Sequence, residues 1–156
     1  MITIKEKIGM ISDTHGLVRP EVIAAFEGVG LIIHAGDIGG PEVLEALRAV
    51  APVVAVRGNN DKGDWARTLP ETEVAEVSGS RFYLLHDRNE LALNPAAAGF
   101  KAVISGHSHR PSIETKEGVL FINPGSAGPR RFKLPVSIAL IRIQGTDLKA
   151  EIRTLL

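Results

Sequence analysis

The sequence predicts one α/β domain built on mixed β-sheets, and three features of the 156-residue chain support this prediction. The first third alternates short apolar runs with helix-like stretches, which is typical of parallel strands joined by right-handed crossovers. The remainder holds apolar runs separated by glycine-containing turns, as in hairpins. No repeat, low-complexity segment or long linker divides the chain, so we expect a single domain over residues 1–156.

The first third predicts three strands and two helices in alternation. Strands are expected over residues 8–12, 31–34 and 52–56, because each is an apolar run of strand length. A helix is expected over residues 20–26, which begin with a proline that suits a first helical turn. A second helix is expected over residues 41–50, whose apolar side chains recur on one face.

The remainder of the chain predicts mainly strands. They are expected over residues 73–77, 81–85, 102–105, 113–115, 119–122, 136–143 and 148–155. Turn residues such as Ser78-Gly79-Ser80 and Glu117-Gly118 separate consecutive runs into hairpins. Residues 89–99 are rich in Ala and Leu and predict a helix, interrupted at Asn94-Pro95.

Composition excludes several classes of function. The formal net charge is zero, so the overall field attracts neither extended nucleic acid nor an anionic membrane surface. Cysteine is absent, which excludes disulfides, thiolate catalysis and Cys-type zinc sites. The charged residues Lys5, Glu6 and Lys7 argue against a secretory leader, and no apolar run approaches the roughly 20 residues of a membrane span. We therefore expect a cytoplasmic protein with no membrane partner.

Metal-ligand side chains follow five of the expected strands. They are Asp13, His15, Asp37, Asn59, His86, His107 and His109. Because the carboxyl ends of parallel strands meet at one edge of a sheet, we expect these side chains to converge there. Two Asp, one Asn and four His suit a pair of hard-to-borderline divalent ions better than a single ion. Gly36, Gly58 and Gly106 each precede a candidate ligand, where glycine permits positive φ and close approach.

Five short blocks occur in the order D-x-H, G-D, G-N-x-D, H and G-H-x-H. They read Asp13-Thr14-His15, Gly36-Asp37, Gly58-Asn59-Asn60-Asp61, His86 and Gly106-His107-Ser108-His109. In this order the chain resembles the calcineurin-like metallophosphoesterase superfamily. Its small size and Asn123-Pro124-Gly125-Ser126 are similar to the compact prokaryotic phosphodiesterase branch, over about residues 8–131. The resemblance implies two packed mixed β-sheets flanked by helices, a four-layer sandwich.

The resemblance also implies two divalent ions per chain, bridged by the Asp37 carboxylate. Asp13, His15 and His109 would complete the first site, and Asn59, His86 and His107 the second. Manganese is the expected ion, with nickel, iron and zinc as alternatives. A hydroxide activated by both ions would attack phosphorus in line with the leaving group, without an organic cofactor.

Several further residues receive roles by the same resemblance. The predicted catalytic group is Asp37, Asn59, His86 and Asp61, where Asp61 braces the loop through hydrogen bonds instead of binding a metal. Asn60 stands where the large phosphatases of the superfamily place a proton-donating histidine, and asparagine is no useful acid near neutral pH. Asn60, Arg110 and Arg130 are the candidates for contacting substrate. We interpret His34, at which no family ligand falls, as a core histidine.

The leading functional hypothesis is a metal-dependent phosphodiesterase that acts on a small phosphodiester. A phosphomonoesterase or a nuclease is a second hypothesis, although zero net charge and the absence of an aromatic-basic stripe argue against extended nucleic-acid contacts. The third hypothesis is a non-catalytic, metal-binding scaffold for partner proteins that resembles the retromer scaffold subunit. Whether the apolar carboxyl-terminal strands pair with a second copy in a homo-oligomer stays open.

Overall fold

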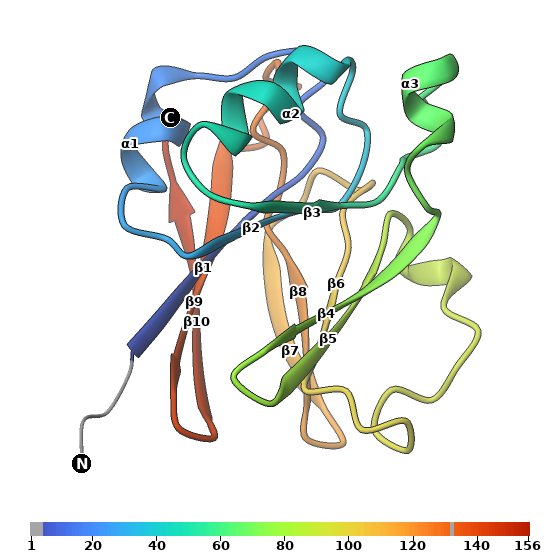
Figure 1. Cartoon of the computed structure of the whole chain (residues 1–156), viewed down its shortest axis with the longest axis vertical. Helices are drawn as coiled ribbons and strands as arrows, with labels where there is room; N and C mark the ends of the chain where they lie inside the picture. Colours follow the sequence, from blue (N-terminus) through green and yellow to red (C-terminus); the bar gives the residue numbers. More distant parts are fainter. Residues whose placement is uncertain (1–4, 132) are drawn as a thin grey trace.

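Two five-stranded β-sheets make up the molecule and face each other (Figure 1). The computed structural model describes residues 5–131 and 133–156, so the single domain predicted over 1–156 includes positions, 1–4 and 132, that lie outside the described residues. Each sheet combines parallel with antiparallel pairs. The predicted α/β class with two mixed sheets is confirmed.

The first sheet has the strand order β10-β9-β1-β2-β3. Its parallel part consists of β1 (Lys5–Ile11), β2 (Leu31–His34) and β3 (Val53–Ala55), joined by α1 (Pro20–Ala25) and α2 (Pro41–Arg48). The antiparallel part is β9 (Ser137–Gln144) with β10 (Asp147–Thr154). Ile11 lies opposite His34, and His34 lies opposite Ala55, so the three parallel strands end at one level.

The second sheet has the strand order β4-β5-β6-β8-β7. Here β5 (Ser80–Leu85), β6 (Ala102–Ile104) and β8 (Val119–Asn123) are parallel, while β4 (Thr72–Val77) and β7 (Ser112–Lys116) are antiparallel edges. Leu84 of β5 lies opposite Ile104 of β6, so these two strands also end together. A four-residue helix, α3 (Asp64–Arg67), connects the sheets and was not predicted.

Three layers of apolar side chains hold the sheets and helices together. The central layer lies between the sheets and includes Met10, Ile33, Phe82 and Leu84. A second layer packs α1 and α2 onto the outer face of the first sheet through Phe26, Leu47 and Leu140. Each of these large side chains contributes about 1.5–3 kcal/mol when fully buried. The central layer fixes how the two sheets sit on each other, and therefore how their strand ends meet.

The helix predicted over residues 89–99 is wrong. The chain forms only the 3-10 helix η1 (Arg88–Glu90) and a turn that ends at Gly99, where φ is +83°. Asn94-Pro95 prevents a continuous helix, since proline disfavours the helical conformation of the residue before it. This irregular segment, with Leu91 and Ala96, packs against the outer face of the second sheet in place of a helical layer. Among the described residues, no helix has the length and apolar character that crossing a membrane requires.

Candidate metal centre

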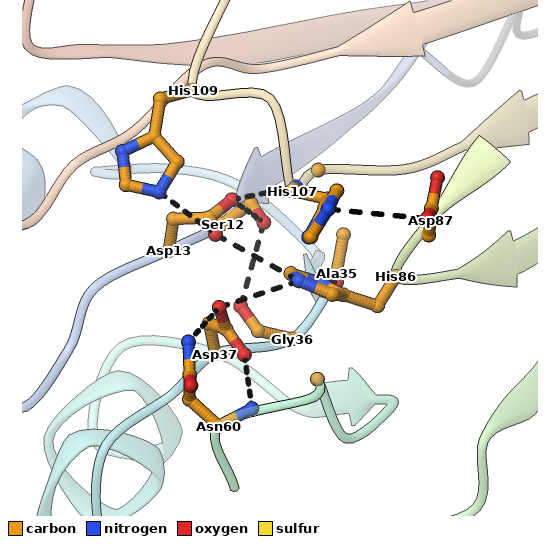
Figure 2. A network of polar contacts seen from close by, with 12 residues as sticks. Ser12, Asp13, Ala35, Gly36, Asp37, Asn60, His86, Asp87, His107 and His109 are labelled. Carbon is orange, nitrogen blue, oxygen red and sulfur yellow. Dashed lines mark hydrogen bonds and ion pairs between the residues drawn. The ribbon is translucent and has the colours of Figure 1, made fainter. Parts of the chain in front are cut away.

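Polar side chains that follow five strands meet at one end of the two sheets (Figure 2). Asp13 follows β1, Asp37 follows β2 and Asn59 follows β3 in the first sheet. His86 directly follows β5, and His107 and His109 follow β6, in the second sheet. The expected convergence at one sheet edge therefore needs a correction, because the ligands come from two sheets. Their meeting depends on how the sheets pack as well as on parallel strand order.

Two buried carboxylates lie at the middle of the cluster. Asp13 Oδ1 lies 3.3 Å from His109 Nε2, 3.9 Å from His15 Nε2 and 3.9 Å from His86 Nε2. Asp37 Oδ2 lies 3.4 Å from His86 Nε2 and 3.9 Å from His15 Nε2. Each carboxylate thus faces imidazole nitrogens that come from both sheets.

Several buried polar atoms of this cluster have no hydrogen-bond partner. They are Asp13 Oδ1, His15 Nε2, His86 Nε2 and His109 Nδ1. Buried polar groups are normally paired, and a cation held between Asp13 Oδ1, His15 Nε2 and His86 Nε2 would pair these three atoms. The ligand atoms of Asp13, His15 and His109 lie within 4.8 Å of one another, and so do those of Asp13, Asp37 and His86. Imidazole with carboxylate is a donor set that suits divalent first-row metals, so the residues present fit a metal centre.

The two groups share Asp13, whereas the resemblance implies Asp37 as the shared ligand. Asp37 Oδ2 nevertheless faces His15, assigned to the first site, and His86, assigned to the second. Both carboxylates therefore lie between the two candidate positions, and either has the reach to serve both.

Five candidate ligands have a left-handed backbone conformation. They are Asp13, His15, Asp37, His107 and His109, with φ of +55°, +46°, +54°, +72° and +63°. Within residues 5–131 and 133–156, the other non-glycine residues with positive φ are Ser78 and Glu117, both in hairpin turns. Such conformations cost on the order of 1–3 kcal/mol each and persist only where the surroundings enforce them. Backbone strain is therefore concentrated at the residues that face the candidate metal positions.

The glycines before the ligands serve mainly for close approach. A Cβ on Gly58 would overlap the backbone and carboxylate of Asp37, and one on Gly106 would lie 2.6 Å from Asp13 Oδ2. Of Gly36, Gly58 and Gly106, only Gly36 has positive φ, at +102°. At the other two positions the missing side chain, and not the backbone conformation, is what the site requires.

Hydrogen bonds from neighbouring residues orient both carboxylates. Asp13 Oδ2 accepts from Ser12 Oγ at 2.6 Å and from the His107 backbone N–H at 3.0 Å. Asp37 accepts from Asn60 twice, from its backbone N–H on Oδ1 and from its side-chain Nδ2 on Oδ2, each at 3.0 Å. Asn60 therefore contacts a ligand carboxylate, as an exposed residue at the edge of the cluster.

The electrostatics of the cluster favour ionised carboxylate beside imidazole. Burial raises the pKa of Asp37, but the nearby His86 imidazole and two hydrogen bonds from Asn60 outweigh it and hold that pKa well below its usual range. Burial lowers the pKa of His86, yet the Asp37 carboxylate and the Ala35 carbonyl raise it overall. For His109, burial exceeds the attraction of Asp13 and lowers the pKa, with Arg131 adding to the effect. His109 is thereby kept in the neutral form that ligates metals.

A backbone carbonyl sets the tautomer of His86. Its Nδ1 lies 2.7 Å from the Ala35 carbonyl oxygen, which can only accept a hydrogen bond. Nδ1 therefore carries the proton in the neutral ring, and the lone pair of Nε2 points at Asp13 and Asp37. Fixing one ring nitrogen so that the other can ligate is the usual arrangement of metal-binding histidines.

His34 is fully buried, and both of its ring nitrogens form hydrogen bonds inside the protein. Its Nδ1 accepts from the Gly36 N–H at 3.1 Å, so Nε2–H donates to Thr14 Oγ1 at 3.0 Å. Thr14 Oγ1 in turn donates to the Ile38 carbonyl at 2.7 Å. Burial lowers the pKa of His34 to about 3 and keeps the ring neutral. His34 thus joins the segments that carry Asp13 and Asp37, which supports its interpretation as a core histidine.

Asn59 and His107 are the exposed members of the predicted ligand set. Both line a pocket of about 370 Å³ beside His86, together with Arg57 and Glu90. The structure brings them next to the cluster, and His107 belongs to neither of the tight groups of carboxylate and imidazole atoms around Asp13. They lie on the open side, where a substrate would reach the centre.

Asp61 links the loops that follow β2 and β3 through hydrogen bonds. Its carboxylate accepts from three backbone N–H groups, those of Ile38, Gly39 and Gly58, at 2.8–3.1 Å. The side chain therefore ties the end of β2 to the end of β3 and does not face the cluster. The Asn123-Pro124-Gly125-Ser126 turn acts similarly, since Asn123 Nδ2 donates to the Gly106 carbonyl and Ser126 Oγ donates to the Asp13 carbonyl.

The two arginines predicted to contact substrate lie in different surroundings. Arg130 is exposed and donates to the Leu134 carbonyl of its own loop at 3.2 Å. Arg110 is exposed and lines a second pocket of about 350 Å³ that His107 also lines. Arg57 instead lines the pocket beside His86, and this residue was missed. Its position directly before Gly58-Asn59 is the signal that could have identified it.

Comparison with known proteins places the fold and the motifs in one family. The calcineurin-like phosphoesterase superfamily domain matches residues 7–146. A probable metallophosphoesterase of Methanothermobacter thermautotrophicus is 39% identical over 93% of this chain and 90% of its own length.

Solved structures with the same fold include an enzyme and a sorting protein. An archaeal phosphodiesterase superposes with a TM-score of 0.77 at 25% identity, over 94% of this chain and 99% of that one. Vps29 of Chaetomium thermophilum superposes with a TM-score of 0.80 at 20% identity, over 97% of this chain and 86% of that one. The second likeness concerns the fold alone.

Proposed function

The chain belongs to the calcineurin-like phosphoesterase superfamily, and we propose that it is a divalent-metal-dependent phosphodiesterase acting on a small phosphodiester. One observation carries the proposal: the unpaired buried atoms Asp13 Oδ1, His15 Nε2 and His86 Nε2 lie together at one end of the two sheets, and His109 Nε2 lies 3.3 Å from the same Asp13 oxygen. An unpaired buried polar atom costs about 1–3 kcal/mol, and a bound ion would remove this cost for all three atoms at once. The likeness to an archaeal phosphodiesterase supports the choice of reaction.

Two ions would be held by the predicted set of side chains. Asp37 would be shared, with Asp13, His15 and His109 on the first ion and Asn59, His86 and His107 on the second. When bound, such ions make a water-derived nucleophile available near neutral pH and stabilise charge on the phosphate oxygens. Manganese is the expected ion, since carboxylate and amide oxygens accompany the imidazoles.

The residues of the chain itself determine which leaving groups suit the site. Asn60 lies against Asp37, and its amide can donate a hydrogen bond but cannot supply a proton. A leaving group would therefore depart as a stable anion or take its proton from water or from another residue. This favours diesters with acidic alcohols over alkyl monoesters.

The open side of the centre suits a small substrate. The pocket beside His86 and His107 has a volume of about 370 Å³, within the range of small-molecule sites. The net charge of zero provides no field that would gather a polyanion. We therefore favour a small organic phosphodiester over extended nucleic acid.

Hydrolysis of an activated aryl phosphodiester and the matching monoester tests the proposal. Metal-stripped protein is assayed before and after manganese, nickel, zinc or magnesium is restored singly. We expect no turnover without metal and faster turnover of the diester with manganese. Folded protein that hydrolyses neither ester with any metal would contradict the enzyme assignment.

A scaffold for partner proteins is the second candidate, favoured by the likeness in fold to Vps29. A His109→Ala variant distinguishes the two, because His109 is buried at the cluster and contacts no outside surface. Loss of hydrolysis in this variant supports the enzyme. A wild-type protein without hydrolysis that still captures a partner, with capture unchanged in the variant, supports the scaffold.

A further inference from the structure

His107 is held less firmly than the buried histidine ligands. Its side chain is 46% exposed, against 7% for His86 and 6% for His109. The backbone is fixed, because the His107 N–H donates to Asp13 Oδ2. The ring itself lies edge-on to His86, with 5.2 Å between ring centroids. An exposed imidazole with one packing neighbour needs a further partner if it is to present a single nitrogen to an ion.

Asp87 lies where such a partner would be. Its Oδ2 is 3.9 Å from His107 Nε2, and its Oδ1 accepts from the Asn89 N–H at 3.0 Å, at the start of η1 (Figure 2). One carboxylate oxygen is thus anchored to the backbone while the other faces the imidazole. Among the described residues, no other cationic side chain lies within ion-pair distance of Asp87.

The neighbouring charges leave this pair intact. Arg88, next in sequence, lies 3.4 Å from Glu114 Oε2, and its guanidinium lies 4.4 Å from the centre of the Phe121 ring. Arg88 is therefore engaged by Glu114 and the Phe121 ring, in a pocket that Asp87 and His107 also line. Glu90 lines the same pocket as His107 and Asp87 but makes no ion pair among the described residues.

The arrangement at His86 shows what the carboxylate would do. At His86 the Ala35 carbonyl holds Nδ1–H, and Nε2 faces the carboxylates. At His107 the nitrogen that faces an acceptor is Nε2, so Nδ1 is the nitrogen left to ligate. Metal-binding histidines commonly donate their second ring N–H to a carboxylate in this way. The 3.9 Å separation exceeds a hydrogen bond, and rotation of the exposed ring closes it without repacking the core.

We propose that Asp87 is a positioning residue of the second metal site, accepting a hydrogen bond from His107 Nε2–H so that Nδ1 is presented to the ion. This inference rests on the proposed function, because it needs two ions per chain. Removal of such a carboxylate partner weakens metal binding by about 10–100-fold. The first site lacks His107 and should be unaffected.

Cobalt titration of the full metal-stripped chain tests the role of Asp87. Visible absorption and equilibrium dialysis give separate dissociation constants for two Co²⁺ ions, without reference to activity. Asp87→Ser keeps an oxygen that caps η1 but is too short to reach His107, and Asp87→Asn keeps an acceptor at full length. Glu90→Gln is the matched control, because it removes an exposed negative charge from the same pocket.

We expect Asp87→Ser to weaken the second ion about 10–100-fold and leave the first within twofold. Asp87→Asn should weaken the second ion less than Asp87→Ser does. Glu90→Gln should leave both dissociation constants within twofold of wild type. If every variant binds two ions with the same constants as wild type, the positioning role of Asp87 is overturned and the two-ion proposal is not. If Glu90→Gln weakens binding of the second ion as much as Asp87→Ser does, the loss of any negative charge in the pocket explains the effect. That result would overturn the positioning role of Asp87. A wild-type chain that binds one ion or none would overturn the two-ion proposal together with it.

Discussion

The candidate metal centre has a buried half and an exposed half, and they are built differently. Asp13, Asp37, His86 and His109 are buried, and hydrogen bonds or neighbouring ligands fix their directions. Asn59 and His107 are exposed and line a pocket. The difference teaches that the fold preorganises the carboxylates and the buried imidazoles, while the proposed second ion position would be completed at the surface.

Preorganisation of the buried half has a cost in the backbone. Asp13 and Asp37 have positive φ, and glycines must stand where a Cβ would overlap their carboxylates. Such strain is retained only when the rest of the structure holds it in place. Here the apolar layer between the sheets does so, because it fixes the strand ends from both sides.

Asp37→Asn should cause the largest loss, because Asp37 faces both candidate ion positions. Asparagine keeps the shape of the side chain and tolerates the left-handed backbone, so the fold should persist. We expect hydrolysis of the activated diester to fall by about a thousandfold, which corresponds to several kcal/mol of transition-state stabilisation. Metal analysis after dialysis should show fewer than two ions per chain. Full activity with two bound ions would contradict the central place of Asp37.

His109→Ala and His107→Ala compare the halves directly. Both should lower diester hydrolysis about a hundredfold or more, because each removes a ligand to one ion. Only His109→Ala should lower the unfolding free energy of the metal-free protein by about 1–3 kcal/mol, since that imidazole is buried.

His107→Ala, an exposed change, should stay within about 0.5 kcal/mol of wild type in stability. Urea unfolding of the metal-stripped proteins gives the stabilities, and Co²⁺ titration shows which ion is weakened. Equal destabilisation by the two substitutions would remove the distinction between the halves.

Gly58→Ala tests the close approach in the buried half. The added Cβ would overlap Asp37, so we expect a loss of about 1–3 kcal/mol in unfolding free energy and weaker metal binding. Gly30→Ala is the matched control, because its Cβ would find its nearest atom, the Lys7 carbonyl oxygen, 4.0 Å away. Denaturant unfolding should leave this control within about 0.5 kcal/mol of wild type. A Gly58→Ala protein as stable as the control would show that the space is not required.

The pH dependence of stability tests His34, which joins the two buried ligand segments. Its pKa falls from 6.5 in the unfolded chain to about 3 in the folded protein, so the unfolded chain binds the proton first as pH falls. The contribution to stability is complete above about pH 6.5 and is lost progressively towards pH 3. Between pH 7 and 5.5 this amounts to about 1.3 kcal/mol.

The comparison that isolates His34 is between metal-stripped wild type and His34→Gln, each unfolded in urea across this range. Wild type should lose about 1.3 kcal/mol more than the variant between pH 7 and 5.5, because the other titrating histidines are common to both. Parallel pH profiles would mean that His34 is protonated in the folded protein or reached by water.

Local sequence patterns predicted most of the secondary structure. The strand predicted over residues 31–34 matches β2, and most other predicted strands agree with observed ones to within about two residues. Apolar runs bounded by Gly, Pro or polar residues specify these elements locally. The segment 89–99 failed because its Ala and Leu favour a helix by propensity while Asn94-Pro95 and packing on the second sheet decide otherwise.

The sequence by itself determined the chemistry of this protein: the order of its carboxylates, amide and imidazoles, and the strand that each follows. It did so because ligand type is a property of the residue, and apolar runs position residues along the chain. Only the tertiary structure decided that two sheets supply the ligands, that Asp13 as well as Asp37 lies between both positions, and that Asp87 faces His107. These facts follow from sheet packing and from left-handed turns, which depend on contacts far apart in sequence.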